Sequence, residues 1–384
     1  MTAASMQLRV EGWRGINHSY ALVNQFQLLE LAAREDVVLT HVDKPYFVPQ
    51  WNAQSNGPGF HAAHEAVLAG IAAPAEDAVA DWAFRIFSPV DLEASPHARR
   101  IACFVVTELG LDAASFASGN SLDAYHARGD VFVTPSQWSR DRLVDFGLRS
   151  ESIRVVPHGA SPAYFSPLPL AVRDQQRAAL GFQEDDVVLL NIGAAIWNKG
   201  IDNLLCGFAR ARQTNPRLKL VFKDQRNMYG YSGEDYAQKT LAQHGLLHND
   251  VLNAIKLIPA NLTMPQMNAI YGLADCYVSP YRAEGFNLPV MEAMACGVPV
   301  IVTEGGATDD FVPPGMGHRK IPARLHRNTR IQDKVIGAYL EPDMEALVVE
   351  LARTQRRPDG QQALMPEAGW QGPVQQLLAD LAAA

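Results

Sequence analysis

The sequence predicts an α/β protein with two domains, each built on a parallel sheet. Its 384 residues are more than one hydrophobic core usually holds, so two domains are expected. The runs that we interpret as strands are continuously apolar rather than alternating, which is typical of parallel sheets covered on both faces. Glycine-containing loops follow several of these runs, at the strand ends where such sheets bind ligands.

The first domain is predicted to begin with a strand at 8–10, a loop with two glycines and a helix. Gly15 lets the backbone approach a ligand, and a turn glycine without a ligand explains it equally well. His18 is the polar side chain best placed at this loop, with a helix-capping or exposed histidine as the alternative. Further strands are expected at 37–42, 84–87, 101–107, 131–134 and 153–156.

The rest of the first domain carries fewer signals. Residues 45–80 are rich in glycine, proline, alanine and histidine, and we expect loop with one or two helices there. Glu108 follows the strand at 101–107 and is the polar residue nearest its end, which makes it a candidate site residue. The alternative is that it caps the next segment. Ser136 and Gly147 predict the N-cap and the C-terminus of a helix. His158 is expected to be structural.

The second domain is predicted to open with a strand at 187–192 and a loop that begins at Gly193 and carries Lys199. The next strand runs into Lys223 and Arg226. Neighbouring parallel strands lie roughly 5 Å apart, so these two cations are expected near the Gly193 loop. A solvated loop is the usual location of such charges and is the alternative. Further strands are expected at 218–222 and 255–258, with helices from 202, at 234–244 and at 264–273.

Residues 275–302 are the most informative stretch. They predict a buried strand, a loop, a helix with Pro289 in its first turn, and a second strand. Backbone N–H groups of Phe286, Asn287 and Leu288 would lie near the helix N-terminus, which suits anionic or oxygen-rich groups.

Two glutamates flank the start of this helix. Glu284 lies just before it and Glu292 about one turn inside it. A carboxylate accepts hydrogen bonds from vicinal hydroxyls, so the pair predicts a site for a sugar and a ribose. The alternative is that both glutamates stabilise the helix dipole from solvent. That alternative fits Glu292 poorly, because its helix is rich in alanine and methionine and is expected to be buried.

This stretch resembles the E-x7-E motif of retaining family 4 glycosyltransferases. The matching residues are Glu284, Gly285, Phe286, Asn287, Leu288, Pro289 and Glu292, followed by Ala-Met-Ala-Cys-Gly-Val-Pro-Val. The resemblance implies the GT-B fold, in which two Rossmann-like domains with parallel sheets face a central cleft. It implies that Glu292 binds the ribose of a nucleotide donor, that Glu284 contacts the transferred sugar, and that the loop amides face the sugar and diphosphate. It also places the Gly15 loop beside the donor phosphates and the acceptor.

The sequence departs from its relatives at two places. They carry an arginine directly after the glycine at 193 and a lysine five residues later; Lys199 matches, but Ala194 replaces the arginine. They often have a histidine close to the transferred sugar, where Glu108 is here the nearest polar candidate. We predict that Lys223 or Arg226 supplies the missing charge, Lys223 being the better placed.

The predicted domains are 1–166 on the acceptor side and 174–365 on the donor side, joined by a proline-containing linker. Residues 370–384 are expected to form a helix, because four apolar side chains fall on one face, and the resemblance implies that it packs back on the first domain. The charged segment 319–334 is expected to be irregular.

Composition excludes several classes of protein. The formal net charge is −8 and no dense basic run occurs, which argues against nucleic acid as a partner. No apolar run reaches the roughly 18 residues of a transmembrane helix. The four cysteines fit neither a zinc spacing nor a disulfide framework, so we expect buried thiols and a cytoplasmic protein.

The sequence thus predicts a hexosyltransferase-type enzyme that moves a sugar from a nucleotide diphosphate donor to a hydroxyl of a glycan, a lipid-linked or a small-molecule acceptor. No cofactor or metal ion is expected, because the donor loops carry no close acidic cluster. One alternative is a nucleotide-sugar epimerase of the same fold. Another is a catalytically weak sugar-nucleotide binding protein, which the substitution at Ala194 favours. The nucleotide, the sugar and the oligomeric state are left open.

Overall fold

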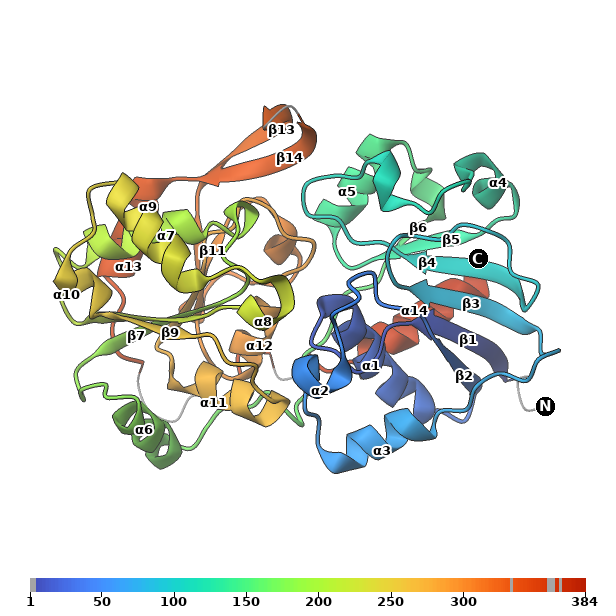
Figure 1. Ribbon diagram of the computed structural model, residues 1–384, viewed down its shortest axis with the longest axis horizontal. Helices are drawn as coiled ribbons and strands as arrows, with labels where there is room; N and C mark the ends of the chain where they lie inside the picture. Colours follow the sequence, from blue (N-terminus) through green and yellow to red (C-terminus); the bar gives the residue numbers. More distant parts are fainter. Residues whose placement is uncertain (1–4, 332–333, 358–362, 366–367) are drawn as a thin grey trace. The chain divides into compact units, whose positions relative to one another are not determined.

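The computed structural model describes residues 5–331, 334–357, 363–365 and 368–384 (Figure 1). The chain forms two compact units, one of residues 1–159 with 369–384 and one of residues 160–368. This division falls a few residues before the linker that the prolines predict. The predicted α/β architecture, with a parallel sheet in each unit, is confirmed.

The first unit contains a six-stranded parallel sheet in the order β2-β1-β3-β4-β5-β6. Its strands are β1 Met6–Gly12, β2 Val37–Asp43, β3 Ala80–Ile86, β4 Ala98–Phe104, β5 Val131–Thr134 and β6 Ile153–Val155. Its helices are α1 Ser19–Ala32, α2 Ala53–Asn56, α3 Ala62–Gly70, α4 Leu122–Ala127, α5 Gln137–Phe146 and α14 Gln371–Ala383.

Local signals place the ends of its helices. Ser136 Oγ accepts the N–H of Ser139 at 3.0 Å, and Gly147 ends α5 in the left-handed conformation, so both predicted caps are confirmed. α14 buries one apolar face, and Trp370 just before it stacks on Phe26 of α1 with ring centroids 5.5 Å apart. The last helix of the chain is therefore part of the first unit.

The second unit contains another six-stranded parallel sheet, in the order β12-β11-β10-β7-β8-β9. Its strands are β7 Val187–Ile192, β8 Leu218–Lys223, β9 Ile255–Ile258, β10 Cys276–Ser279, β11 Val300–Thr303 and β12 Arg319–Ile321. Its helices are α6 Leu170–Ala179, α7 Ile201–Ala211, α8 Arg226–Tyr229, α9 Gly233–Gln243, α10 Asn249–Leu252, α11 Met264–Leu273, α12 Leu288–Ala295 and α13 Met344–Ala352.

The central strands β7, β10 and β11 are buried along their whole length, as their continuous apolar runs predict. Asp275, directly before β10, is buried at the amino end of the sheet. Its carboxylate accepts hydrogen bonds from the side chains of Arg173 and Arg177 of α6 and from the backbone N–H groups of Val188 and Arg357. This buried cluster fixes α6 to the sheet.

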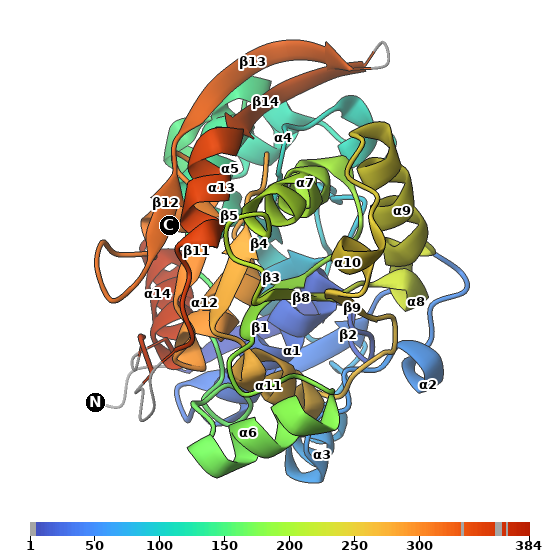
Figure 2. The ribbon, with the colours of Figure 1, turned by 90° about the vertical axis from the view of Figure 1, so that its left-hand side faces the viewer.

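The expectation that 319–334 is irregular is wrong. Apart from 332 and 333, which lie outside the described residues, this segment forms β12, β13 Ala323–Ile331 and the first residue of β14 Lys334–Pro342, and β13 and β14 pair as an antiparallel hairpin. Figures 1 and 2 show the hairpin as a long, curved ribbon leaving the sheet of the second unit. The backbone N–H and carbonyl groups of the two strands hydrogen-bond to each other. The hairpin therefore forms without the continuous apolar run that marks a buried strand in the sequence.

Candidate functional site

The loop between β7 and α7 begins at the carboxyl edge of the second sheet. The N–H of Gly193 donates to the carbonyl of Lys223 at 3.1 Å, and a Cβ at position 193 would meet nothing within 4 Å. A short 3-10 helix, Trp197–Lys199, follows and ends at Gly200. Gly200 has φ +66°, and a Cβ there would lie 1.9 Å from the carbonyl oxygen of Pro280. Glycine is therefore required at 200, where this loop crosses the end of β10.

Hydrogen bonds fix this loop to the one that follows β10. The carbonyl of Asn198 accepts the N–H groups of Arg282 and Ala283 at 2.8 and 3.1 Å. The buried guanidinium of Arg282 donates to both oxygens of Asp202, at 2.7 and 2.9 Å, and stacks over the ring of Trp197. The two loops therefore form one rigid assembly.

This assembly brings together two of the residues predicted from the sequence. Lys199 Nζ lies 2.6 Å from Glu284 Oε2, although the residues are 85 positions apart. The Glu284 side chain is only 10% exposed and that of Lys199 is 21% exposed. A cation and a carboxylate thus meet at the carboxyl edge of the sheet, where water has limited access.

Glu292 is buried within α12, which confirms that its helix does not expose it to solvent. The hydroxyl of Tyr271, on α11, donates to Glu292 Oε2 at 2.5 Å. Burial raises the pKa of the Glu292 carboxyl to about 7, and the hydrogen bond from Tyr271 acts in the opposite direction. The helix-dipole alternative, which needs a solvated carboxylate, does not describe this residue.

The residues between the two glutamates have the predicted shape. Asn287 adopts the left-handed conformation at φ +77° as the N-cap of α12, and its Nδ2 donates to Ser279 Oγ at 3.0 Å. Phe286 stacks on Phe311 with centroids 4.7 Å apart, while Gly285 is buried beside it. Leu288 is the first residue of the helix, and the N–H groups of a first turn have no acceptor within the helix itself.

The predicted proximity of Lys223 to the Gly193 loop is confirmed for its backbone, since Lys223 pairs with Ile192 across the sheet, and Arg226 begins α8 three residues further along the chain. The Lys223 side chain is buried, its Nζ donates to the carbonyl of Asp224 at 2.7 Å, and burial lowers its pKa. Arg226 donates to Ser232 Oγ at 2.6 Å. Both cations thus lie at the predicted edge with protein partners of their own, and their role toward a ligand stays a prediction.

In the first unit, His18 caps α1. Its Nδ1 accepts the N–H of Tyr20 at 3.2 Å, and burial among aromatic side chains such as Trp13 and Trp51 lowers its pKa to about 4. The capping interpretation is therefore confirmed. The imidazole is neutral at pH 7, and because Nδ1 accepts, the proton lies on Nε2.

Gly15 and Glu108 lie at the same carboxyl edge of the first sheet. Gly15 has φ +79°, and its N–H donates to Gln25 Oε1 at 2.9 Å. The carbonyl of Glu108 accepts the Trp138 indole N–H at 2.7 Å. Burial raises the pKa of Tyr20 to about 12, with a smaller contribution from the charge of Glu108, and the Tyr20 ring lies 5.8 Å from that of His18.

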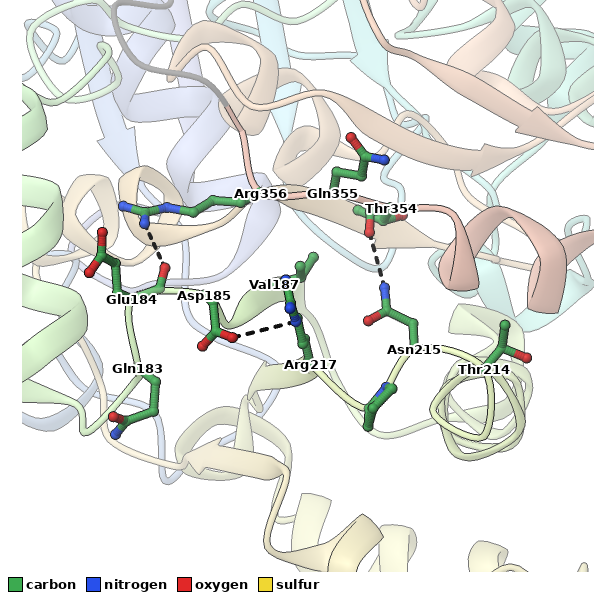
Figure 3. Close-up of a pocket in the computed structure, with 11 residues that line it drawn as sticks. Gln183, Glu184, Asp185, Val187, Thr214, Asn215, Arg217, Thr354, Gln355 and Arg356 are labelled. Atoms are coloured by element: carbon green, nitrogen blue, oxygen red, sulfur yellow. Dashed lines mark hydrogen bonds and ion pairs between the residues drawn. The ribbon is translucent and has the colours of Figure 1, made fainter.

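Other parts of the molecule offer weaker sites. A depression of about 900 Å³ lies at the amino ends of β7 and β8 (Figure 3). Its charged groups are mutually compensated, as in the ion pair of Arg217 with Asp185 at 3.4 Å, and ligands of parallel sheets bind at the opposite strand ends. Within the described residues, no cluster of three histidine, cysteine or acidic side chains could hold a metal ion. The described part of the chain also has no helix of the length and hydropathy that crossing a bilayer requires.

Two parallel sheets in separate units, with glycine loops and paired charges at the carboxyl edge of the second, form an α/β architecture whose ligands usually bind at that edge. Residues 172–320 match the family model of the glycosyl transferases group 1. The resemblance to glycosyltransferases predicted from the sequence is thereby confirmed.

Curated relatives are similar over about half of the chain. An MMP alpha-(1->4)-mannosyltransferase of Mycolicibacterium hassiacum is 28% identical over 186 residues, which are 48% of this chain and 39% of the relative. The lipopolysaccharide 1,2-N-acetylglucosaminetransferase of Salmonella typhimurium is 28% identical over 208 residues, 52% of this chain and 51% of the relative. The matches thus span about half the length of these relatives or less.

Solved structures extend the likeness to the whole fold. HepE of Anabaena, crystallised with UDP and glucose, superposes with a TM-score of 0.60 at 14% identity, over 99% of this chain and all of that one. A glycosyltransferase from Rickettsia africae gives a TM-score of 0.64 at 11% identity, over 99% of this chain and 98% of that one. The similarity of these structures over nearly the whole chain confirms the predicted GT-B fold.

The sequence did not reveal every residue that shapes the site. Tyr271 and Arg282 make the contacts that fix Glu292 and the Lys199 loop, yet neither residue carries a signal of that role. Their partners lie on other elements and meet them only after the sheet has formed.

Proposed function

We propose that the protein is a glycosyltransferase that moves a hexose from a nucleoside diphosphate sugar to an acceptor hydroxyl with retention of configuration. The observation that carries the proposal is the Lys199–Glu284 pair, which lies with Glu292 in the segment that matches the glycosyl transferases group 1. Two similar proteins are a mannosyltransferase and an N-acetylglucosaminetransferase, and HepE was crystallised with UDP and glucose, which supports this reaction type.

In the proposed reaction, the bond between the anomeric carbon and the diphosphate oxygen breaks, and the anomeric carbon forms a bond to the acceptor oxygen. The acceptor proton leaves with the diphosphate. Negative charge grows on the departing diphosphate, and the positive charge of Lys199 is proposed to stabilise it. Lys223, whose backbone borders the Gly193 loop, is the proposed second cation in place of an arginine at Ala194. These cations and the amides of the 285–288 loop take the part of a metal ion.

The two glutamates have different roles in this proposal. Glu292 accepts hydrogen bonds from the ribose hydroxyls, and Glu284 from the hydroxyls of the transferred sugar. His18 is the proposed site residue of the first unit, where its Nδ1 accepts the N–H of Tyr20.

The acceptor is a glycan, a lipid-linked molecule or a small molecule, and the proposed location is the cytoplasm. The four cysteines are free and buried, as the sequence predicts, and this suits a reducing compartment.

The test is a screen of nucleotide sugars for thermal stabilisation of the protein, followed by turnover of the stabilising donor with candidate acceptors. A glycosyltransferase gives stabilisation by one donor and product only when an acceptor is present. Product from donor alone would indicate an epimerase. Tight donor binding with no turnover on any acceptor would indicate a sugar-nucleotide binding protein, the alternative that Ala194 favours.

A further inference from the structure

Tyr271 connects Glu292 to the core of the second unit. Its hydroxyl donates to Glu292 Oε2 at 2.5 Å, and its ring is completely buried. Phe165 packs edge-on against that ring with centroids 5.8 Å apart, and Tyr277 of β10 lies at 6.1 Å. A ring confined on these sides holds its hydroxyl in one place, so the hydrogen bond also fixes the plane of the carboxylate.

We propose that Tyr271 is a positioning residue whose hydroxyl holds the Glu292 carboxylate in the orientation that receives the ribose hydroxyls of the donor. The inference rests on the proposed function, because it takes Glu292 as the ribose ligand. Tyr271 itself does not touch the nucleotide in this scheme.

The hydrogen bond also affects the charge of Glu292. Burial raises the pKa of its carboxyl to about 7, and Tyr271 is the hydrogen-bond donor that lowers it. The titratable and charged groups around this carboxylate are Tyr271 of α11, Tyr277 of β10, Cys296 directly after α12, Glu284 of the preceding loop, and Arg357, which donates to the carbonyls of Cys296 and Gly297. The two tyrosines and the cysteine are neutral at pH 7, since burial raises the pKa of each.

Removal of the Tyr271 hydroxyl therefore has a predictable sign. The pKa of Glu292 rises further, so the carboxyl is protonated at pH 7 and ionises only at a higher pH. A protonated carboxyl has lost acceptor capacity and accepts two vicinal hydroxyls poorly. Ribose recognition should then be weak at pH 7 and return as the pH rises.

The experiment compares ribonucleotides with deoxyribonucleotides. UDP, GDP and ADP are titrated by calorimetry, and the one that binds most tightly is compared with its 2′-deoxy form between pH 6 and pH 9. The ratio of the two affinities isolates the ribose contact, because ionisation of the diphosphate affects both ligands equally. In the wild type, we expect the ribonucleotide to bind about 10- to 100-fold more tightly at pH 8, as a hydrogen bond to a charged group gives.

In Tyr271→Phe, the ring and its packing are kept. We expect the preference for the ribonucleotide at pH 7 to fall to about threefold or less and to recover by pH 9, with the affinity for the 2′-deoxy form unchanged. Glu292→Gln cannot ionise, so its affinity ratio should be low and independent of pH. Tyr125→Phe removes another fully buried tyrosine hydroxyl, which accepts the N–H of Cys103 and donates to the carbonyl of Val131 in the first unit, and should behave as the wild type.

Three results separate the possibilities. Equal losses of affinity for both nucleotides in Tyr271→Phe would mean that the hydroxyl is merely structural, and the inference would be overturned. An unchanged ratio in Tyr271→Phe, with the wild type still binding nucleotide, would overturn the inference while leaving the proposed function intact. Failure of the wild type to bind any of the three diphosphates would overturn both.

Discussion

The ion pair of Lys199 and Glu284 allows the structural and chemical roles of one contact to be measured separately. Lys199→Met and Glu284→Gln each remove one charge at nearly constant volume, and the double variant removes both. Each single variant leaves a charge with limited access to water, and the double variant leaves none. We therefore expect each single variant to lose stability. The double variant should lose less stability than the sum of the two single losses.

The expected magnitude follows from the geometry. Two unit charges 2.6 Å apart attract by about 6 kcal/mol at an effective dielectric constant of about 20. Most of this attraction offsets the desolvation of the two groups, and the remaining exposure of Lys199 screens it further. A coupling free energy of about 1–3 kcal/mol should remain.

The assay is urea unfolding of the four proteins, with turnover of the stabilising donor measured in parallel. The matched control is the ion pair of Arg210 and Glu345, which joins α7 to α13 with side chains 36% and 75% exposed. Its cycle, Arg210→Met with Glu345→Gln, should give a coupling below about 1 kcal/mol and leave turnover unchanged.

The double variant decides between the roles. We expect it to regain stability relative to the single variants but to remain inactive, because the reaction needs both groups. A coupling no larger than that of the control pair would refute the structural reasoning. A double variant with wild-type turnover would refute the assignment of these residues to the site.

Four further predictions follow from the same geometry. Glu292→Ala should weaken nucleotide binding by about 10- to 100-fold, equivalent to roughly 1.5–3 kcal/mol, and unchanged affinity by calorimetry in a folded variant would contradict the ribose assignment. Lys199→Ala and Lys223→Ala should both lower turnover, with Arg226→Ala less affected; if only Lys199→Ala is impaired, the idea of compensation for the missing arginine is wrong. Gly200→Ala should cost about 2–4 kcal/mol of stability in urea unfolding, since the residue is left-handed and its new Cβ would overlap a carbonyl oxygen; wild-type stability would contradict the observed turn. Turnover should persist in excess chelator, and a complete loss restored by Mg²⁺ or Mn²⁺ would show that a metal ion is required.

Much of the fold could be predicted because its signals are local. β7, β9 and α11 have the bounds expected from their apolar runs and caps, and the caps of α5 lie at Ser136 and Gly147. The central stretch was recognisable because strand, loop and helix follow one another directly in the chain. Local sterics and hydrogen bonding decide such features within a few residues.

The errors have an equally physical origin. The segment 319–334 was expected to be irregular because it is charged. In the structure, β13 pairs with β14, and the N–H of Leu340 on β14 donates to the carbonyl of Arg282 in the loop after β10. His18 could be placed at its loop, but its capping role and its neutral tautomer depend on the aromatic side chains that bury it. Burial by distant segments leaves no trace in the residues themselves.

The sequence by itself determined the succession of strands and helices, the glycine loops at the carboxyl edges, and the candidates Lys199, Glu284 and Glu292. Only the tertiary structure decided their state: it pairs Lys199 with Glu284, buries Glu292 and sets Tyr271 against it. The charge of a carboxyl depends on its solvation and on the donors within a few ångströms. Those neighbours come from elements separated along the chain, and the packing of the sheet and its helices selects them.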